Sequence, residues 1–70
     1  MRFDVYGRFQ IEVERDNDRW VAYRVGLGKR SKVEDLVIPD DLSRQEIPNY
    51  LDAFYHELAR FGQKVVEISP

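Results

Sequence analysis

The sequence contains no cysteine and a single histidine. Without cysteine, neither a disulfide nor a thiolate metal site can stabilise so small a fold. One histidine is too few for an ordinary structural zinc site, and Arg60 stands where a zinc-protease helix would place a second histidine after His56. We therefore predict no metal site and no cofactor. The absence of cysteine also favours a reducing, cytoplasmic location.

Long apolar runs and a strong net charge are also missing. No segment approaches the roughly 20 apolar residues of a membrane-spanning helix, and the charged, alternating start does not resemble a signal peptide. The net charge is −2, so no global basic field can hold nucleic acid non-specifically. We predict a soluble protein without a membrane partner, in which any electrostatic binding is local.

What is present is a globular composition, 43% hydrophobic and 34% charged, in 70 residues. That length makes one domain, residues 1–70, with a small core. Apolar residues of the first segment fall on odd positions, which is the period of a strand with one buried face: Phe3, Val5, Phe9, Ile11 and Val13. Gly7 keeps this parity and favours one long strand bent at the glycine. The alternative is a tight turn at Gly7-Arg8 that pairs Tyr6 with Phe9.

A second strand follows the break at residues 16–18. A three-residue loop there places Val13 opposite Val21, so that the apolar residues of both strands share a face. A two-residue loop would instead set Val13 against Ala22. We predict the odd-length loop. Residues 26–32 then form a glycine-rich basic connection, and residues 33–38 form a third strand that ends at Pro39.

The helix begins with a capping box, Ser43 and Glu46. Its apolar stripe recurs every three or four residues: Ile47, Leu51, Phe54, Leu58 and Phe61. Gly62 is suited to the C-terminal cap. Pro48 leaves two alternatives open, a helix that starts at Pro48 after a short helical turn or a kinked first turn. Residues 65–68 form a last strand.

These elements predict an α+β fold in the order β-β-β-α-β, an antiparallel sheet with one amphipathic helix packed on one face. Leu36 and Ile38 join the core. Because nothing else covers the other face, Trp20 is expected to stand on it with Tyr6 and Ala22. Exposed aromatic residues on a sheet face are enriched in protein interfaces. We therefore predict a protein interface at these three residues and a homodimer.

No catalytic residues are predicted. Ser43 is explained by helix capping, and Asp16 and Asp18 lack the glycine and glutamate of a calcium loop. No acid, base or nucleophile converges by spacing, so we predict that the protein is not an enzyme. A second possible site is basic, with four cations that could contact a phosphate or a nucleic acid: Arg24, Lys29, Arg30 and Lys32. They do not form a Walker motif.

Four short motifs resemble a family of short, uncharacterised bacterial proteins: Phe3-Asp4-Val5-Tyr6-Gly7-Arg8, Gly28-Lys29-Arg30, Asp35-Leu36-Val37-Ile38-Pro39 and His56-Glu57. This resemblance implies a bacterial origin and no known activity. The element order is also similar to that of HicB-like antitoxin domains, whose proline-aspartate-leucine-proline-glycine turn is partly matched by residues 39–43. The leading hypothesis is a non-catalytic interaction module. The alternatives are nucleic-acid or phosphate binding and an antitoxin-like partner of a small toxin.

Overall fold

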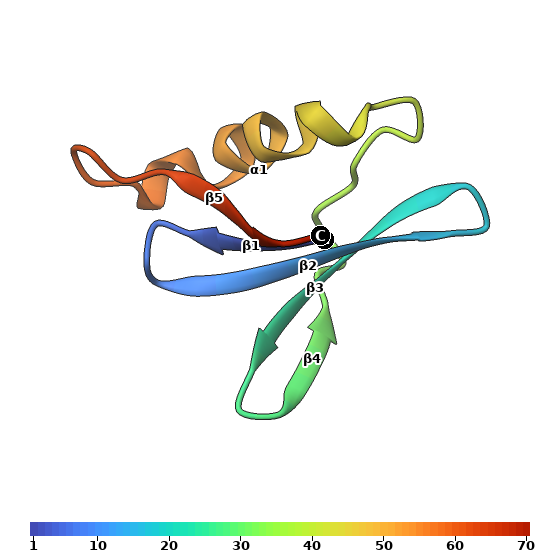
Figure 1. Cartoon of the computed structure of the whole chain (residues 1–70), viewed down its shortest axis with the longest axis horizontal. Coiled ribbons are helices and arrows are strands. Elements are labelled where there is room, and N and C mark those ends of the chain that lie inside the picture. Colours follow the sequence, from blue (N-terminus) through green and yellow to red (C-terminus); the bar gives the residue numbers. More distant parts are fainter.

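The computed structural model describes residues 1–70. It contains a five-stranded antiparallel sheet with one helix packed across one face (Figure 1). The strands lie in the order β4-β3-β2-β1-β5. Their bounds are β1 Arg2–Val5, β2 Phe9–Asp16, β3 Arg19–Gly26, β4 Lys29–Lys32 and β5 Val65–Ser69. The predicted fold class is confirmed, although four strands rather than three precede the helix.

The first predicted strand is a hairpin, so a single strand bent at Gly7 is wrong. Tyr6 and Gly7 take positive φ angles of 58° and 69°, and Arg8 adds a third residue to the turn. Because this loop has an odd number of residues, Phe3 lies opposite Ile11. The alternative turn at Gly7-Arg8 was close to the observed turn in position but wrong in register. The observed register pairs Val5 with Phe9 instead of Tyr6 with Phe9, which keeps the odd residues on one face.

The second hairpin has a two-residue loop, which corrects the predicted register. Asn17 and Asp18 have φ angles of 50° and 63°, the positive values that both central residues of a type I′ turn require. Val13 therefore faces Ala22 instead of Val21. The slip by one residue turns Trp20 and Ala22 toward the helix and sends the remaining apolar residues of β3 outward: Val21, Tyr23 and Val25.

A third tight turn, at Leu27 and Gly28, joins β3 to β4. The predicted basic connection is thus itself a hairpin, in which β4 replaces the strand expected over residues 33–38. Those residues form an irregular loop instead. Leu36 and Ile38 are nevertheless buried, as predicted, because the loop crosses the sheet on its way to the helix.

The helical segment has three parts: the 3₁₀ turn η1 Arg44–Glu46, α1 Ile47–Tyr55 and the 3₁₀ turn η2 His56–Leu58. Ser43 caps it, and its N–H donates to Glu46 Oε1 at 3.0 Å. Of the two alternatives at Pro48, the short helical turn before the helix proper is correct, because η1 precedes α1. Pro48 lies in the first turn of α1, where a missing N–H costs little. None of the helical segments has the length and hydrophobicity of a membrane span.

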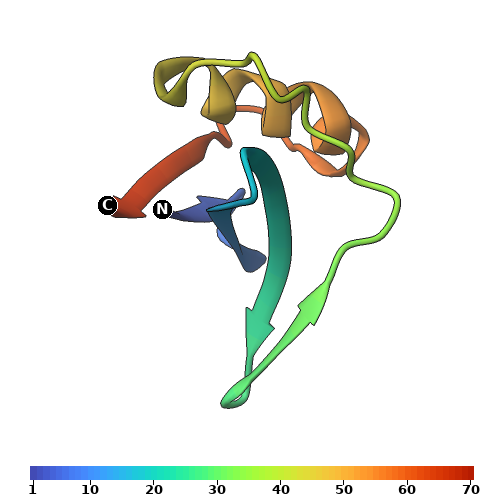
Figure 2. The same cartoon turned by 90° about the vertical axis from the view of Figure 1, so that its right-hand side faces the viewer.

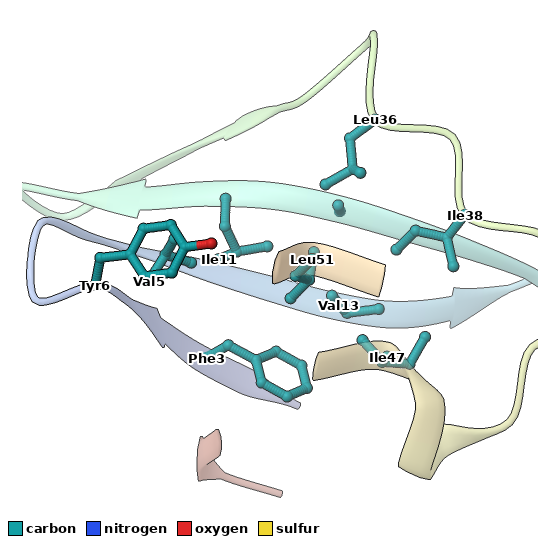
Figure 3. Packing of buried hydrophobic residues seen from close by; sticks show 10 residues of the cluster. Phe3, Val5, Tyr6, Ile11, Val13, Leu36, Ile38, Ile47 and Leu51 are labelled. Atoms are coloured by element: carbon teal, nitrogen blue, oxygen red, sulfur yellow. The ribbon is translucent and has the colours of Figure 1, made fainter. Parts of the chain in front are cut away.

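The core lies between the sheet and α1 (Figure 3). It comprises ten buried residues: Phe3, Val5, Tyr6, Ile11, Val13, Ala22, Leu36, Ile38, Ile47 and Leu51. Of the predicted helix stripe, only Ile47 and Leu51 are buried. Phe54 and Leu58 are partly exposed and Phe61 is fully exposed. The prediction that the helical stripe continues to Phe61, with Gly62 as its C-terminal cap, is wrong because the helical segment ends at Leu58.

Candidate interaction site at the free edge of β3

The three predicted interface residues do not lie on the uncovered face. Tyr6 and Ala22 are buried in the core, and Trp20 is half-buried against it. The physical reason for Ala22 and Trp20 is the two-residue turn at Asn17 and Asp18, which reverses the faces of β3. Tyr6 sits in the first turn and directs its ring toward the other core side chains (Figure 3).

Tyr6 joins the first hairpin to the helix. Its hydroxyl donates to the Asp52 carboxylate and lies 3.2 Å from the Asp52 carbonyl oxygen. Burial, together with the hydrogen bond to Asp52, raises the pKa of Tyr6 to about 12. The hydroxyl of Tyr6 is therefore held in its neutral form as the donor of a structural hydrogen bond to Asp52.

Trp20 connects β3 to the loop that precedes the helix. Its indole Nε1–H donates to the carbonyl oxygen of Leu42 at 3.0 Å. The guanidinium group of Arg15 stacks 4.0 Å from the ring centroid and donates to the Asp40 carbonyl oxygen at 2.9 Å. These contacts hold the loop beside β3 without closing the space between them.

That space is a hollow of about 280 Å³. Apolar residues from β3 and from the loop line it: Trp20, Val21, Ala22, Val33, Leu36, Val37 and Ile38. Charged residues of both signs complete the lining: Arg19, Lys32, Glu34 and Asp40. The volume lies below the roughly 300–1,000 Å³ of clefts that hold drug-sized ligands, so it suits one or two side chains of a partner.

One side of the hollow is a free strand edge. β4 pairs with β3 only from Tyr23 to Gly26 and then diverges from it (Figure 2). The N–H of Val33 donates to Ala22 O at 3.0 Å and extends the pairing by one bond. Hydrogen bonding alternates along an antiparallel strand, so Trp20 and Ala22 direct their main-chain groups away from β2. The N–H and C=O of Trp20 and the N–H of Ala22 are therefore left without a strand partner.

The uncovered face of the sheet carries a network of ion pairs instead of an aromatic cluster. Arg2 donates to Glu12 at 3.0 Å, and Arg30 donates to both Glu12 and Glu14. The hydrogen bonds from Arg2 and Arg30 hold the pKa of Glu12 below its ordinary value. The Arg30 guanidinium also stacks 4.0 Å from the ring centroid of Tyr23. The carboxylates of Glu12 and Glu14 on this face are therefore already paired with arginine side chains of the same face.

The four predicted phosphate-contacting residues are divided between the two faces of the β3–β4 hairpin. Arg24 and Lys29 point to the helix side, and Arg24 stacks 4.2 Å from the ring centroid of Phe9. Arg30 and Lys32 point to the other side. Arg30 is already paired with two carboxylates. The hairpin brings the four residues close in space but divides their charges between two surfaces.

Comparison with protein families identifies a match. A family model described as a domain of unknown function, DUF7661, covers residues 1–69. The chain belongs to this family. The match confirms the resemblance to a family without a known activity. Neither a curated protein nor a solved structure matches the chain, and its four strands before the helix differ from the three of the HicB-like order.

The single histidine of this DUF7661 domain lies outside the hollow. His56 is exposed, with its Nδ1 2.9 Å from the Ala53 carbonyl oxygen. No three His, Asp or Glu side chains are placed to hold a metal ion together. The hollow beside β3 is lined by seven hydrophobic residues, against one and two in the hollows beside α1 and at the β3–β4 turn.

Sequence reasoning missed this hollow because it depends on where β4 ends. One signal was present. Reading residues 27 and 28 as a hairpin turn would have placed a short, charged strand over Lys29–Lys32. Such a strand is half as long as β3, with four residues against eight, and leaves the first half of β3 unpaired.

Proposed function

We propose that this protein is a non-catalytic interaction module that binds an extended segment of a protein partner at the free edge of β3. The observation that carries the proposal is the unpaired N–H and C=O of Trp20 and the unpaired N–H of Ala22 beside an apolar hollow. A segment that pairs with this edge would gain main-chain hydrogen bonds, and its alternate side chains would point into the hollow. This is the recognition mode known as β-strand addition.

The lining of the hollow supports one anchoring side chain. Trp20 offers a half-buried aromatic surface, the residue type most enriched in binding hot spots. Leu36 and Ile38 form an apolar floor. Since cations and carboxylates both stand in the lining, the charge of the hollow favours neither an acidic nor a basic partner. We therefore expect an aliphatic or aromatic side chain at the centre of the bound segment.

The absence of convergent chemistry supports a binding role over an enzymatic one. Tyr6, the group with the largest pKa change, is committed to the Asp52 contact and does not line the hollow. The proposal includes a bacterial, cytoplasmic protein, supported by the motif resemblance and by the lack of cysteine. An antitoxin would be one case of such a module. Nucleic-acid binding is less well supported, because the basic residues are divided between two faces.

The test uses Trp20 itself, which is the single tryptophan of the chain and lines the hollow. Peptides selected from a displayed random library against the whole protein would be titrated while tryptophan fluorescence and backbone amide shifts are recorded. We expect saturable changes at Trp20 and Ala22, and an apolar residue at the centre of the selected peptides.

Two matched substitutions sharpen the result. Val37→Asp places a charge in the lining of the hollow, and Leu27→Asp places the same charge at a distant hairpin turn. Both residues are exposed, so both variants should fold. Peptide binding should fall at least tenfold in Val37→Asp and stay unchanged in Leu27→Asp, in line with about 1.4 kcal/mol or more for a buried unpaired charge. Equal binding to both variants, or amide shifts away from β3, would refute the proposal.

A further inference from the structure

The two outer edges of the sheet differ in chemistry. β4 forms one edge and β5 forms the other. Three of the four residues of β4 are cations, Lys29, Arg30 and Lys32. Charged side chains, lysine above all, are a common device that prevents an edge strand from pairing with another chain. The β4 edge is therefore protected against a second copy of itself.

The β5 edge lacks this protection. Its sequence is Val65-Val66-Glu67-Ile68-Ser69, with no cation and no proline. Val66 and Ile68 are each 49% exposed. The one charged residue, Glu67, is paired with Arg44 at 3.6 Å. The strand is thus aliphatic, close to neutral and open, which are the properties of an edge that accepts another strand.

The free main-chain groups of β5 can be assigned from its pairing with β1. The N–H of Tyr6 donates to Lys64 O at 3.1 Å. Hydrogen bonding alternates along an antiparallel ladder, so Lys64 and Val66 face β1 while Val65 and Glu67 face outward. The register shift of this ladder follows the Phe3–Glu67 pair, so the pairing from Val65 to Glu67 precedes it. The part of the edge at Val65 and Glu67 is therefore regular enough to pair.

We infer that β5 pairs with β5 of a second copy, antiparallel about a two-fold axis, to form one continuous sheet through both molecules. Residues opposite each other in such a ladder share a face, which restricts the register. With Val66 opposite Val66 of the second copy, Val65 lies opposite Glu67 and all the outward N–H and C=O groups of these two residues gain partners. The axis also brings together two exposed valines.

A second copy fits this edge better than a strand of another kind for two reasons. The β5 edge is neutral because Arg44 offsets Glu67, so two copies meet without repulsion. The pairing is also closed: each copy uses the same edge once, whereas β5 against β4 of the next copy would continue without end. Since the contact is one strand wide, we expect a dimer that dissociates on dilution.

The experiment measures mass against concentration by sedimentation. The monomer has a mass of 8.3 kDa, and the wild type should approach twice that value as concentration rises. Val66→Lys, on the exposed side of β5, should remain a monomer at every concentration. Val25→Lys puts the same charge on the same face of the sheet beside β4, and it should dimerise like the wild type. Amide exchange at Val65 and Glu67 should slow in the dimer.

A wild type that stays monomeric, or a Val66→Lys variant that still dimerises, would overturn this inference. Equal loss of dimer in Val25→Lys would also do so, because it would point to the open face instead of the edge. The inference is independent of peptide binding at β3. Val66→Lys should bind the selected peptides as the wild type does, so the two proposals can fail separately.

Discussion

Replacing Tyr6 by phenylalanine should destabilise the domain and alter its response to alkali. The substitution removes the hydroxyl that donates to the Asp52 carboxylate and leaves the buried ring in place. Hydrogen bonds to charged groups contribute about 1.5–3 kcal/mol. Asp52 is exposed and can be rehydrated, so we expect the lower end, about 1.5 kcal/mol. For a domain of this size, that corresponds to a melting temperature about 6–12 °C lower.

The pH dependence gives a second, sharper readout. An unfolded tyrosine ionises near pH 10, whereas folded Tyr6 has a pKa of about 12. Between these values the unfolded chain loses its proton first, so the free energy of unfolding must fall as pH rises from about 10 to 12. Tyr6→Phe should lose much of this fall. A smaller fall should remain, because burial also raises the pKa of Tyr55.

The assay is urea unfolding followed by circular dichroism from neutral to strongly alkaline pH. Tyr50→Phe is the matched control, since its hydroxyl donates to the Val37 carbonyl oxygen at 2.6 Å in an exposed position where water can replace the bond. Tyr6→Phe should be clearly less stable than Tyr50→Phe. The reasoning fails if the two variants have the same stability and the same alkaline profile.

Three further predictions concern the core, the ion pairs and the turns. Leu51→Ala should cost about 2–5 kcal/mol because Leu51 is fully buried, and Phe54→Ala should cost clearly less because Phe54 is partly exposed; urea midpoints would separate them. Glu12→Gln should be less stable than the wild type at neutral pH, because the lowered pKa of Glu12 contributes stability only while its carboxylate is ionised. This difference in the free energy of unfolding should disappear as pH falls below the ordinary pKa of a glutamate. A difference that stays constant in an acid titration followed by circular dichroism would contradict the prediction. Gly28→Ala should cost about 1–2 kcal/mol because the φ of Gly28 is +75°, whereas Gly28→Asn should cost less; equal thermal stability of the two variants would contradict this.

Much of the core could be predicted from local periodicity. Phe3, Val5, Ile11 and Val13 alternate with polar residues, and this pattern places them on one face whether the chain bends or turns at Gly7. The same holds for Ile47 and Leu51, whose helical spacing puts them on the side of α1 that faces the sheet. These positions depend on neighbours in the chain, which the sequence displays.

The candidate site could not be predicted in this way. β3 carries apolar residues on both faces, with Trp20 and Ala22 on one side and Val21, Tyr23 and Val25 on the other. Two registers therefore satisfied the hydrophobic pattern nearly equally well, and counting apolar residues favoured the wrong one. A loop of two residues, with positive φ at Asn17 and Asp18, is the feature that decides between them.

The sequence by itself determined the class of fold, the buried face of the first hairpin, the helix cap at Ser43 and the last strand, since each of these follows from contacts within a few residues. Only the tertiary structure decided which way Trp20 points and where β4 leaves β3. Those features depend on the loop that crosses from β4 to the helix, whose Leu42 carbonyl accepts the indole N–H of Trp20 from 22 residues away. A contact over that separation leaves no periodic trace in the chain.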